Sequence, residues 1–393
     1  MKKLIAMLLA LALAAGLCAC AAPSAGEAPV KHKIGVAVYD LSDSQVMAFR
    51  EYLENYIAVS FEDVEFVYSM SIRSQQEMMA FLQGCIDSGV EGILNCNSYD
   101  LEKEVQLCAE KGVYMLCPSS TVAPEMFAKV SENPCFLGFF GPGTEMEYAA
   151  GFDMGRYFAS QDYGDSYFIL SGGAPVGNAM HENRTVGILD ALQDSYGVSF
   201  EQSSRELAVS AQPVTVTEGD LTVHIYGGYL GIPEVCEGAA AYFAANPCEN
   251  ILGVIPVGEL AESVGAARLG VIDCYSEENA RLFSAGKLSY VCGKFSSIIG
   301  PAFAAMYNAV TGHAEAFRDN GKAFQIQQGF WTSADKDDYY AKYALSSGIA
   351  LNAYSVEDLM GVIAEYQPDA ALSDLQALAA ACDFAAAAER RGG

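Results

Sequence analysis

An acidic and a basic residue end two neighbouring apolar segments between residues 270 and 294. Asp273 follows the apolar run Gly270–Ile272, and Lys294 follows the apolar run Leu288–Cys292. The residues between these runs have helical spacing, so we expect a strand–helix–strand unit with parallel strands and a right-handed crossover. An open parallel sheet binds ligands beyond the carboxyl ends of its strands. We therefore expect Asp273 and Lys294 at the mouth of a crevice, and no metal or nucleophile motif accompanies them.

Other polar residues could complete a binding site for hydroxyl groups. Arg184 and Asp273 can each bond two hydroxyls at once, which suits a polyol or a sugar. Asn97 follows the third expected strand, and Ser119 follows the fourth. Two alternatives stay open. Arg184 and Asp273 could form a structural ion pair, and Asn or Ser after a strand often only caps a helix.

Motifs of catalysis are missing from the sequence. It contains no G-x-x-x-x-G-K-[ST] phosphate loop and no G-x-S-x-G nucleophile elbow. His181–Glu182 begins like a zinc-protease motif, but no second His stands four residues on. The whole chain has four His residues, so few are available for catalysis that depends on His. We expect a protein that is not an enzyme and that needs no cofactor.

Cysteine is frequent, with twelve residues in all, two of them before residue 21. Most of the others stand in apolar contexts, where Cys acts as a small hydrophobic residue. Four lie near the ends of expected strands: Cys96, Cys117, Cys274 and Cys292. A thiolate metal site there is conceivable, but none of the close pairings of zinc sites is present, so no metal is expected.

The first 32 residues have the character of a targeting segment. Lys2 and Lys3 precede an apolar stretch, Leu4–Leu17, that is short for a membrane span. Leu17–Cys18–Ala19–Cys20 resembles a bacterial lipobox. The resemblance implies a signal peptide over residues 1–19, lipidation of Cys20, a tether over 20–32, and anchoring to the outer face of the cytoplasmic membrane. An ordinary secretory signal is the alternative.

Composition and charge narrow the class of partner. The chain has 393 residues, of which 52% are hydrophobic, enough for two buried cores. A formal net charge of −27 argues against nucleic acid and against anionic lipid as partners. It does not identify a ligand, because solubility alone explains it.

Apolar strands alternate with amphipathic helical stretches over residues 33–139. This pattern predicts a parallel sheet covered on both faces. The expected strands are Lys33–Tyr39, Val64–Ser69, Gly92–Asn95, Val113–Cys117 and Phe136–Phe140. Similar segments follow, including Tyr167–Ser171, Thr222–Tyr226 and Ile251–Val257. Residues 201–232 are the least regular part.

Several segments together resemble the type I periplasmic sugar-binding proteins, the solute receptors of ABC importers. The order and spacing of the segments carry the resemblance more than any single one. They are Ile34–Val38, Gln83–Asn95, Glu147–Gly155, Asn178–Ile188, and the frame Ile272–Asp273–Cys274, Gly286–Lys287–Leu288 and Lys294. In the expected second lobe, Arg184 falls on an Arg that clamps the ligand in this family.

The resemblance implies an α/β fold of two doubly wound parallel-sheet lobes joined by a three-segment hinge. The expected first lobe is 33–140 with 295–325, and the second is 141–294 with 326–354. Residues 355–393 form a helical extension beyond the usual end. The implied ligand-binding residues are Asp43, Gln45, Asn97, Ser119, Arg184, Asp273 and Lys294.

The implied function is a lipid-anchored extracytoplasmic solute-binding protein. It would bind a sugar or a sugar-like small polar ligand between its lobes, deliver it to an ABC permease, and act as a monomer. The alternative is a ligand sensor of the same fold that signals to a membrane receptor kinase.

Departures from the family pattern leave the ligand open. Gln45 and Val46 stand where Phe residues usually sandwich a sugar ring, and Lys294 replaces a Gln. A different, modified or acidic sugar is possible, as is a ligand that is no sugar, because Lys294 with Arg184 would suit a carboxylate or a phosphate. Trp331, the only Trp, could stack on a ligand or fill the hinge or core.

Overall fold

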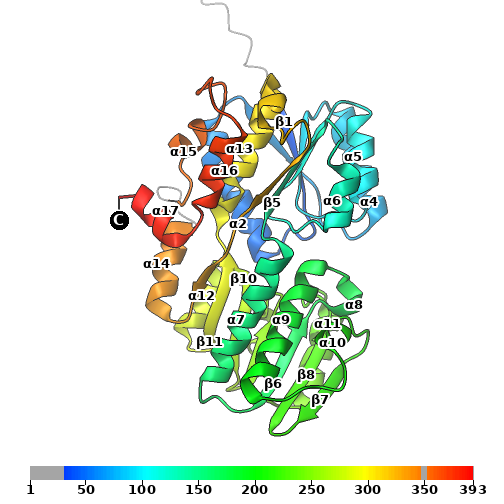
Figure 1. The fold of residues 1–393 in the computed structure, drawn as a ribbon, viewed down its shortest axis with the longest axis vertical. Coiled ribbons are helices and arrows are strands. Elements are labelled where there is room, and N and C mark those ends of the chain that lie inside the picture. Colours follow the sequence, from blue (N-terminus) through cyan, green and yellow to red (C-terminus); the bar gives the residue numbers. More distant parts are fainter. Residues whose placement is uncertain (1–30, 347–351, 393) are drawn as a thin grey trace, which may run out of the picture.

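Two α/β lobes make up the chain (Figure 1), and the computed structural model describes residues 31–346 and 352–392. The first lobe holds a six-stranded sheet in the order β12-β5-β4-β3-β1-β2, in which every neighbouring pair is parallel. Its strands are β1 (His32–Ala37), β2 (Val64–Tyr68), β3 (Gly92–Asn95), β4 (Tyr114–Cys117), β5 (Phe136–Gly141) and β12 (Phe324–Gln327).

The second lobe holds a seven-stranded sheet in the order β13-β11-β10-β9-β6-β8-β7. The five inner strands are parallel, and the two edge strands, β7 and β13, pair antiparallel with their neighbours. The strands are β6 (Ser166–Ser171), β7 (Val214–Glu218), β8 (Leu221–Gly227), β9 (Asn250–Gly253), β10 (Arg268–Cys274), β11 (Leu288–Lys294) and β13 (Trp331–Ser333). The sequence predicted β8 but not its hairpin with β7.

Helices cover both faces of each sheet, because the inner strands are apolar on both sides. In the first lobe, α4 and α5 pack on one face, and α2 and α13 on the other. The helices up to the middle of the chain are α2 (Ser44–Tyr52), α3 (Ala58–Ser60), α4 (Gln75–Asp87), α5 (Leu101–Ala109), α6 (Pro124–Val130), α7 (Thr144–Ser160), α8 (Gly173–Val176), α9 (Ala179–Tyr196) and α10 (Ser204–Ala208). The later ones are α11 (Pro233–Ala245), α12 (Glu277–Ser284), α13 (Gly300–Asn308), α14 (Lys336–Ser346), α15 (Val356–Met360), α16 (Leu372–Ala380) and α17 (Phe384–Arg390).

Helix α4 shows how the sequence pattern becomes packing. Ser74 caps its start by accepting a hydrogen bond from the backbone N–H of Glu77. Met78, Leu82 and Cys85 follow at helical spacing, and all three are buried against the sheet. This face of α4 is therefore part of the core.

Helices α7 and α9 pack closely because two glycines face the opposite backbone. A Cβ at Gly151 would lie 2.0 Å from the carbonyl oxygen of Arg184, and one at Gly187 would lie 2.1 Å from that of Tyr148. The small residues of α7 and α9 thus let the two helices approach closely. This contact fixes the backbone of Arg184.

The chain passes between the lobes after β5, after β11 and between β12 and β13. The C-terminal helices lie beside α13 of the first lobe (Figure 1), where the Tyr52 hydroxyl donates to the carbonyl of Tyr354. Trp331, at the third passage, is 2% exposed and stacks on Phe295 at 4.1 Å between ring centroids. Its indole N–H donates to the carbonyl of Cys382, so this side chain belongs to the core at the hinge.

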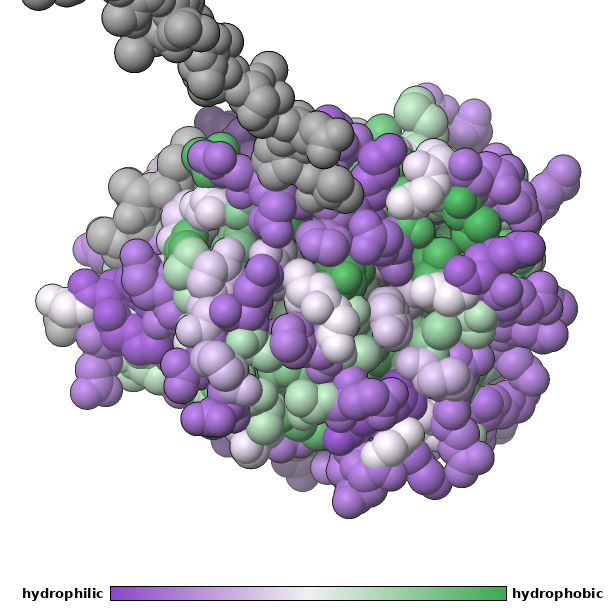
Figure 2. Space-filling view, turned by 90° about the horizontal axis from the view of Figure 1, so that it is seen from above, coloured by the Kyte–Doolittle hydropathy of each residue, from purple (hydrophilic) through white to green (hydrophobic). Residues whose placement is uncertain are grey.

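The surface is largely hydrophilic, as expected for the net charge of −27. On the face shown in Figure 2, apolar residues form small groups that polar residues interrupt. Within residues 31–346 and 352–392, no helix is both long enough and apolar enough to span a bilayer.

Candidate functional site

The carboxyl ends of the two sheets meet at the interface between the lobes. Ser119 follows β4 of the first lobe, and Lys294 ends β11 of the second. The Lys294 ammonium group donates to the carbonyl oxygen of Ser119 at 2.7 Å, and both residues are buried. Ligands bind beyond the carboxyl ends of parallel strands, and both residues stand at such ends. Two predicted site residues from distant parts of the sequence are thus in direct contact.

Asp43 lies on the first-lobe side of this interface. Its carboxylate caps α2 by accepting hydrogen bonds from the backbone N–H groups of Gln45, at 2.9 Å, and Val46, at 3.2 Å. Burial raises the pKa of this carboxyl group. The hydroxyl of Tyr229, from the loop after β8 of the second lobe, lies 3.5 Å from the same carboxylate. One carboxylate oxygen of Asp43 therefore caps α2, and the other oxygen faces Tyr229 of the second lobe.

Asp273 lies on the second-lobe side, at the end of β10. Its side chain accepts a hydrogen bond from the Asn279 amide at 2.9 Å. Burial, together with the nearby negative charge of Asp43, raises the pKa of Asp273 to about 7. Two carboxyl groups from opposite lobes thus influence each other across the interface.

Arg184 is buried and already has a carboxylate partner. Its Nε donates to Glu147 at 2.5 Å, and Nη1 donates to the carbonyl oxygens of Val254, at 3.2 Å, and Ile272, at 3.4 Å. The guanidinium group also lies over the ring of Phe330, 5.5 Å from its centroid. The structural ion pair considered for Arg184 thus has Glu147, and not Asp273, as its partner.

Glu147 connects the two lobes. It is fully buried on α7, and its second carboxylate oxygen lies 3.0 Å from the hydroxyl of Thr121 in the first lobe. Sequence reasoning missed this residue. The one available signal was its position in the matched stretch Glu147–Gly155, where its neighbours are apolar or small.

Two basic side chains near Arg184 have lowered pKa values, which favours their neutral forms. Burial lowers the pKa of Lys294 to about 8. Burial, with the positive charges of Arg184 and Lys294, lowers the pKa of His181 to about 3, so the imidazole is neutral at neutral pH. His181 was considered only as part of a failed zinc motif, and it joins the site because the first turn of α9 carries it there.

Three buried polar atoms near this interface have no hydrogen-bond partner among the described residues. They are Nδ2 of Asn97, Oγ of Ser119 and Nδ1 of His181. Ser119 also has a backbone φ of 52°, which is unusual for a residue other than glycine. Buried polar atoms are nearly always bonded, and backbone strain gathers at functional sites. These atoms are therefore candidates for bonds to ligand hydroxyls.

The remaining predicted residues are placed as follows. Gln45 is half-buried and contributes its backbone N–H to the cap at Asp43, and the backbone N–H of Asn97 donates to the Asn95 side chain at 3.2 Å. Cys20 lies outside the described residues. The ligand-binding role of all seven residues stays a prediction.

The cysteines near the strand ends are buried or half-buried thiols. Burial raises the pKa of Cys96, Cys274 and Cys292, so each stays protonated at neutral pH. Within the part of the chain that the structure describes, no three His, Cys, Asp or Glu side chains are grouped so that they could hold a metal ion.

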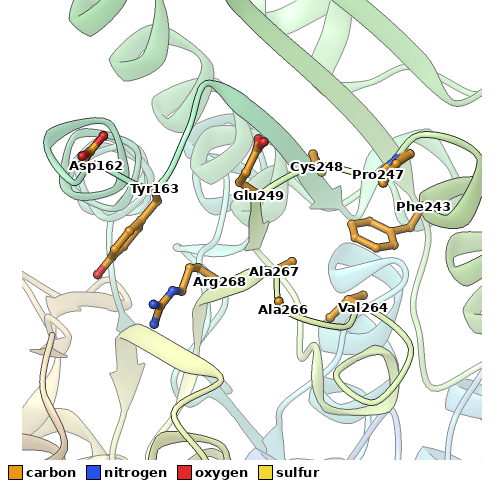
Figure 3. Close-up of a pocket in the computed structure, with 10 residues that line it drawn as sticks. All are labelled: Asp162, Tyr163, Phe243, Pro247, Cys248, Glu249, Val264, Ala266, Ala267 and Arg268. Carbon is orange, nitrogen blue, oxygen red and sulfur yellow. The ribbon is translucent and has the colours of Figure 1, made fainter.

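A separate pocket of about 640 Å³ lies at the amino ends of β9 and β10, the far end of the second sheet (Figure 3). Tyr163 and Arg268 point to one side of it, and Phe243 lies on the other. The Arg268 guanidinium group lies 5.1 Å from the centroid of the Tyr163 ring. None of the seven predicted binding residues lines this pocket.

Comparisons with known proteins agree with this architecture. No family model matches the chain, and no curated protein matches it. Among solved structures, a galactofuranose-binding protein has a TM-score of 0.59 at 9% identity, over 80% of this chain and 98% of that one. An ABC transporter solute-binding protein from Bacillus halodurans C-125, with bound myo-inositol, has a TM-score of 0.58 at 13% identity, over 81% and 99%.

The arabinose-binding component of an ABC transporter from Shewanella sp. ANA-3 has a TM-score of 0.57 at 12% identity, over 79% of this chain and 94% of that one. Identities this low show the fold alone. The chain therefore has the two-lobe fold of the periplasmic sugar-binding proteins, and the predicted fold class is confirmed.

Proposed function

We propose that this protein is an extracytoplasmic solute-binding protein of an ABC importer. It binds a sugar or a sugar-like small polar ligand between its lobes and delivers the ligand to a membrane permease. The observation that carries the proposal is the meeting of both sheets' carboxyl ends at an interface with unpartnered buried polar atoms. The bound arabinofuranose and myo-inositol of the similar structures support the ligand class.

The chemistry of the interface suits hydroxyl groups. Ser119 and Asn97 offer unpartnered polar atoms, Asp43 and Asp273 accept hydrogen bonds, and the neutral His181 ring can accept or donate one. Affinity would come from several buried hydrogen bonds, each worth about 0.5–1.5 kcal/mol, in a site that closing of the lobes shields from water.

Binding can be tested by calorimetry with a panel of pentoses, hexoses, inositols and other polyols. We expect at least one member to bind, and Ser119→Ala to weaken it by about 0.5–1.5 kcal/mol, because its hydroxyl has no other partner. The matched control is Ser160→Ala, whose exposed hydroxyl donates to the Tyr157 carbonyl and accepts from the Gln161 side chain at the end of α7. If no polyol binds to the intact protein, the proposed function is wrong.

Arg184 is a poor choice for such a test. Replacing it with Ala would leave Glu147 fully buried without its cation, so the fold would suffer with the site.

The proposal also includes delivery of the ligand to a permease and attachment of the protein to the membrane. The lipobox-like segment would attach the protein through Cys20 to the outer face of the cytoplasmic membrane, next to the permease. Mass spectrometry of the membrane-extracted protein should find a diacylglyceryl group on Cys20, and Cys20→Ser should release the protein from the membrane fraction. An unmodified, soluble wild-type protein would contradict anchoring and leave binding untouched. The protein is proposed to act as a monomer, which light scattering can test.

A further inference from the structure

Four carboxyl groups gather at the interface, and the positive charge of Arg281 acts on one of them, Glu278. Asp43 caps α2 of the first lobe, α2 contacts β10 of the second lobe, and Asp273 stands on β10. The charges of Asp43 and Glu259 also act on Glu278. The Glu278 carboxylate packs against the backbone of Gly258, next to Glu259. Within residues 31–346 and 352–392, no ion pair reaches any of these four acids.

The cations of this region are already engaged elsewhere. Arg73 pairs with Asp40 at 2.7 Å, Arg184 pairs with Glu147, and Lys294 donates to the Ser119 carbonyl. Lys294 and Arg184, which the sequence suggested for a carboxylate or a phosphate, therefore already have partners within the protein. A ligand with a negative charge would instead add to an acidic surplus.

Aromatic rings border the same acids. Tyr39 of the first lobe and Tyr229 of the second meet edge to face, 6.3 Å apart between centroids. The Tyr229 hydroxyl lies 3.3 Å from Asp40 and 3.5 Å from Asp43. Carboxylates with aromatic rings are the surroundings that ammonium groups prefer in proteins.

A separate observation points to a ligand at the same interface. Ser119 is 7% exposed, and its hydroxyl has no partner among the described residues. The carbonyl oxygen of Ser119 accepts a hydrogen bond from Lys294 of the second lobe. The unpartnered Ser119 hydroxyl therefore belongs to a residue at which the two lobes are in contact. The interface thus offers carboxylates for a positively charged group of a ligand, and the Ser119 hydroxyl for a hydroxyl group of the same ligand.

We propose that the ligand carries a protonated amine, as an amino sugar or an amino polyol does, and that Asp43 and Asp273 hold this ammonium group from opposite lobes. The inference rests on the proposed function and names the class of its ligand. It also explains how two carboxylates can face each other in a closed protein, because a positive charge between them turns repulsion into attraction.

The test is calorimetry on the intact protein near neutral pH with matched sets of sugars. Each set holds the amino, the neutral and the uronic acid form of one parent: glucosamine, glucose and glucuronate, and the corresponding galactose series. In at least one set the amino form should bind about tenfold or more tighter than the neutral form, and the uronate weakest. Asp43→Asn and Asp273→Asn should each remove most of that preference, and the exposed control Asp369→Asn should leave it unchanged.

The outcomes separate the two proposals. If neutral sugars bind with no preference for the amine, or if both Asn variants keep the full preference, the ammonium site is wrong and sugar binding stands. Tighter binding of a uronate overturns the ammonium site as well. If no member of any set binds while a pentose, an inositol or another polyol of the wider panel does, the ammonium site is wrong and the proposed function stands. If nothing in the wider panel binds either, both proposals fail.

Discussion

Asp273→Asn is expected to make the protein more stable, and increasingly so as the pH rises. The folded protein surrounds Asp273 with groups that disfavour its negative charge, chiefly by burial and then by the charge of Asp43. In the unfolded chain the carboxyl group ionises freely. Because the folded-state pKa is raised, the folded state binds more protons than the unfolded state between about pH 4 and pH 7. Stability is lost over that window as the pH rises and stays flat above it.

The structure sets the magnitude of the effect. A pKa of about 7, against 3.8 for an ordinary aspartate, corresponds to about 4 kcal/mol at about 1.36 kcal/mol per pH unit. The Asp273 side chain is only half-buried, so solvent screens its charge and we expect about 1–2 kcal/mol. Asparagine keeps a side-chain oxygen that can accept the bond from Asn279.

Urea unfolding of wild type and variant at about pH 5 and about pH 8 measures this effect. The stability advantage of Asp273→Asn should be larger at the higher pH by about 0.5 kcal/mol, because part of the total effect of about 1–2 kcal/mol is already present at about pH 5. The exposed control Asp369→Asn should show the same small difference from wild type at both pH values. An Asp273→Asn variant with an advantage that does not change with pH, or with lower stability at about pH 8, would refute the argument.

Three further variants test other parts of the structure. Glu147→Gln leaves the Arg184 guanidinium buried without its carboxylate and should lower the unfolding free energy by about 3 kcal/mol, and an unchanged urea midpoint would show that the ion pair is unimportant. Gly151→Ala places a Cβ 2.0 Å from the Arg184 carbonyl and should cost about 1–3 kcal/mol, whereas Gly84→Ala, which meets open space in a helix, should leave the melting temperature equal or higher. Lys294→Met removes a hydrogen bond between the lobes and should increase the radius of gyration in X-ray scattering, and an unchanged radius would show that the lobes stay together without it.

The position of the site followed from the sequence because it depends on local pattern and on one topological rule. Strand, helix and strand over 270–294 put Asp273 and Lys294 at the same edge of a sheet, whatever the rest of the chain does. The alternation of strands and helices similarly predicted two parallel sheets. The antiparallel edge strand β7 was missed. Its valines alternate with threonines, which suits a strand, but the segment is mostly exposed and its place in the sheet depends on pairing with β8.

The partners of the site residues could not be read from the sequence. Glu147 looks like a surface acid in the first turn of a helix, and it is buried only because α7 packs on α9 and approaches Thr121 of the first lobe. Tyr229 follows β8 in the least regular segment, so nothing local placed it beside Asp43. Such contacts arise from how the two lobes meet, which no short sequence pattern encodes.

The balance of charges at the interface links the ligand to the closing of the lobes. Lys294 favours closing, because its ammonium group bonds the Ser119 carbonyl of the other lobe. Asp43 and Asp273 oppose closing once both are ionised, since they come from opposite lobes and each disfavours the other's charge. On our proposal, an ammonium group between them removes this opposition and leaves the Lys294 bond intact. The loaded protein would then differ from the empty one mainly in how firmly its lobes are held together, which is the property by which a permease could tell them apart.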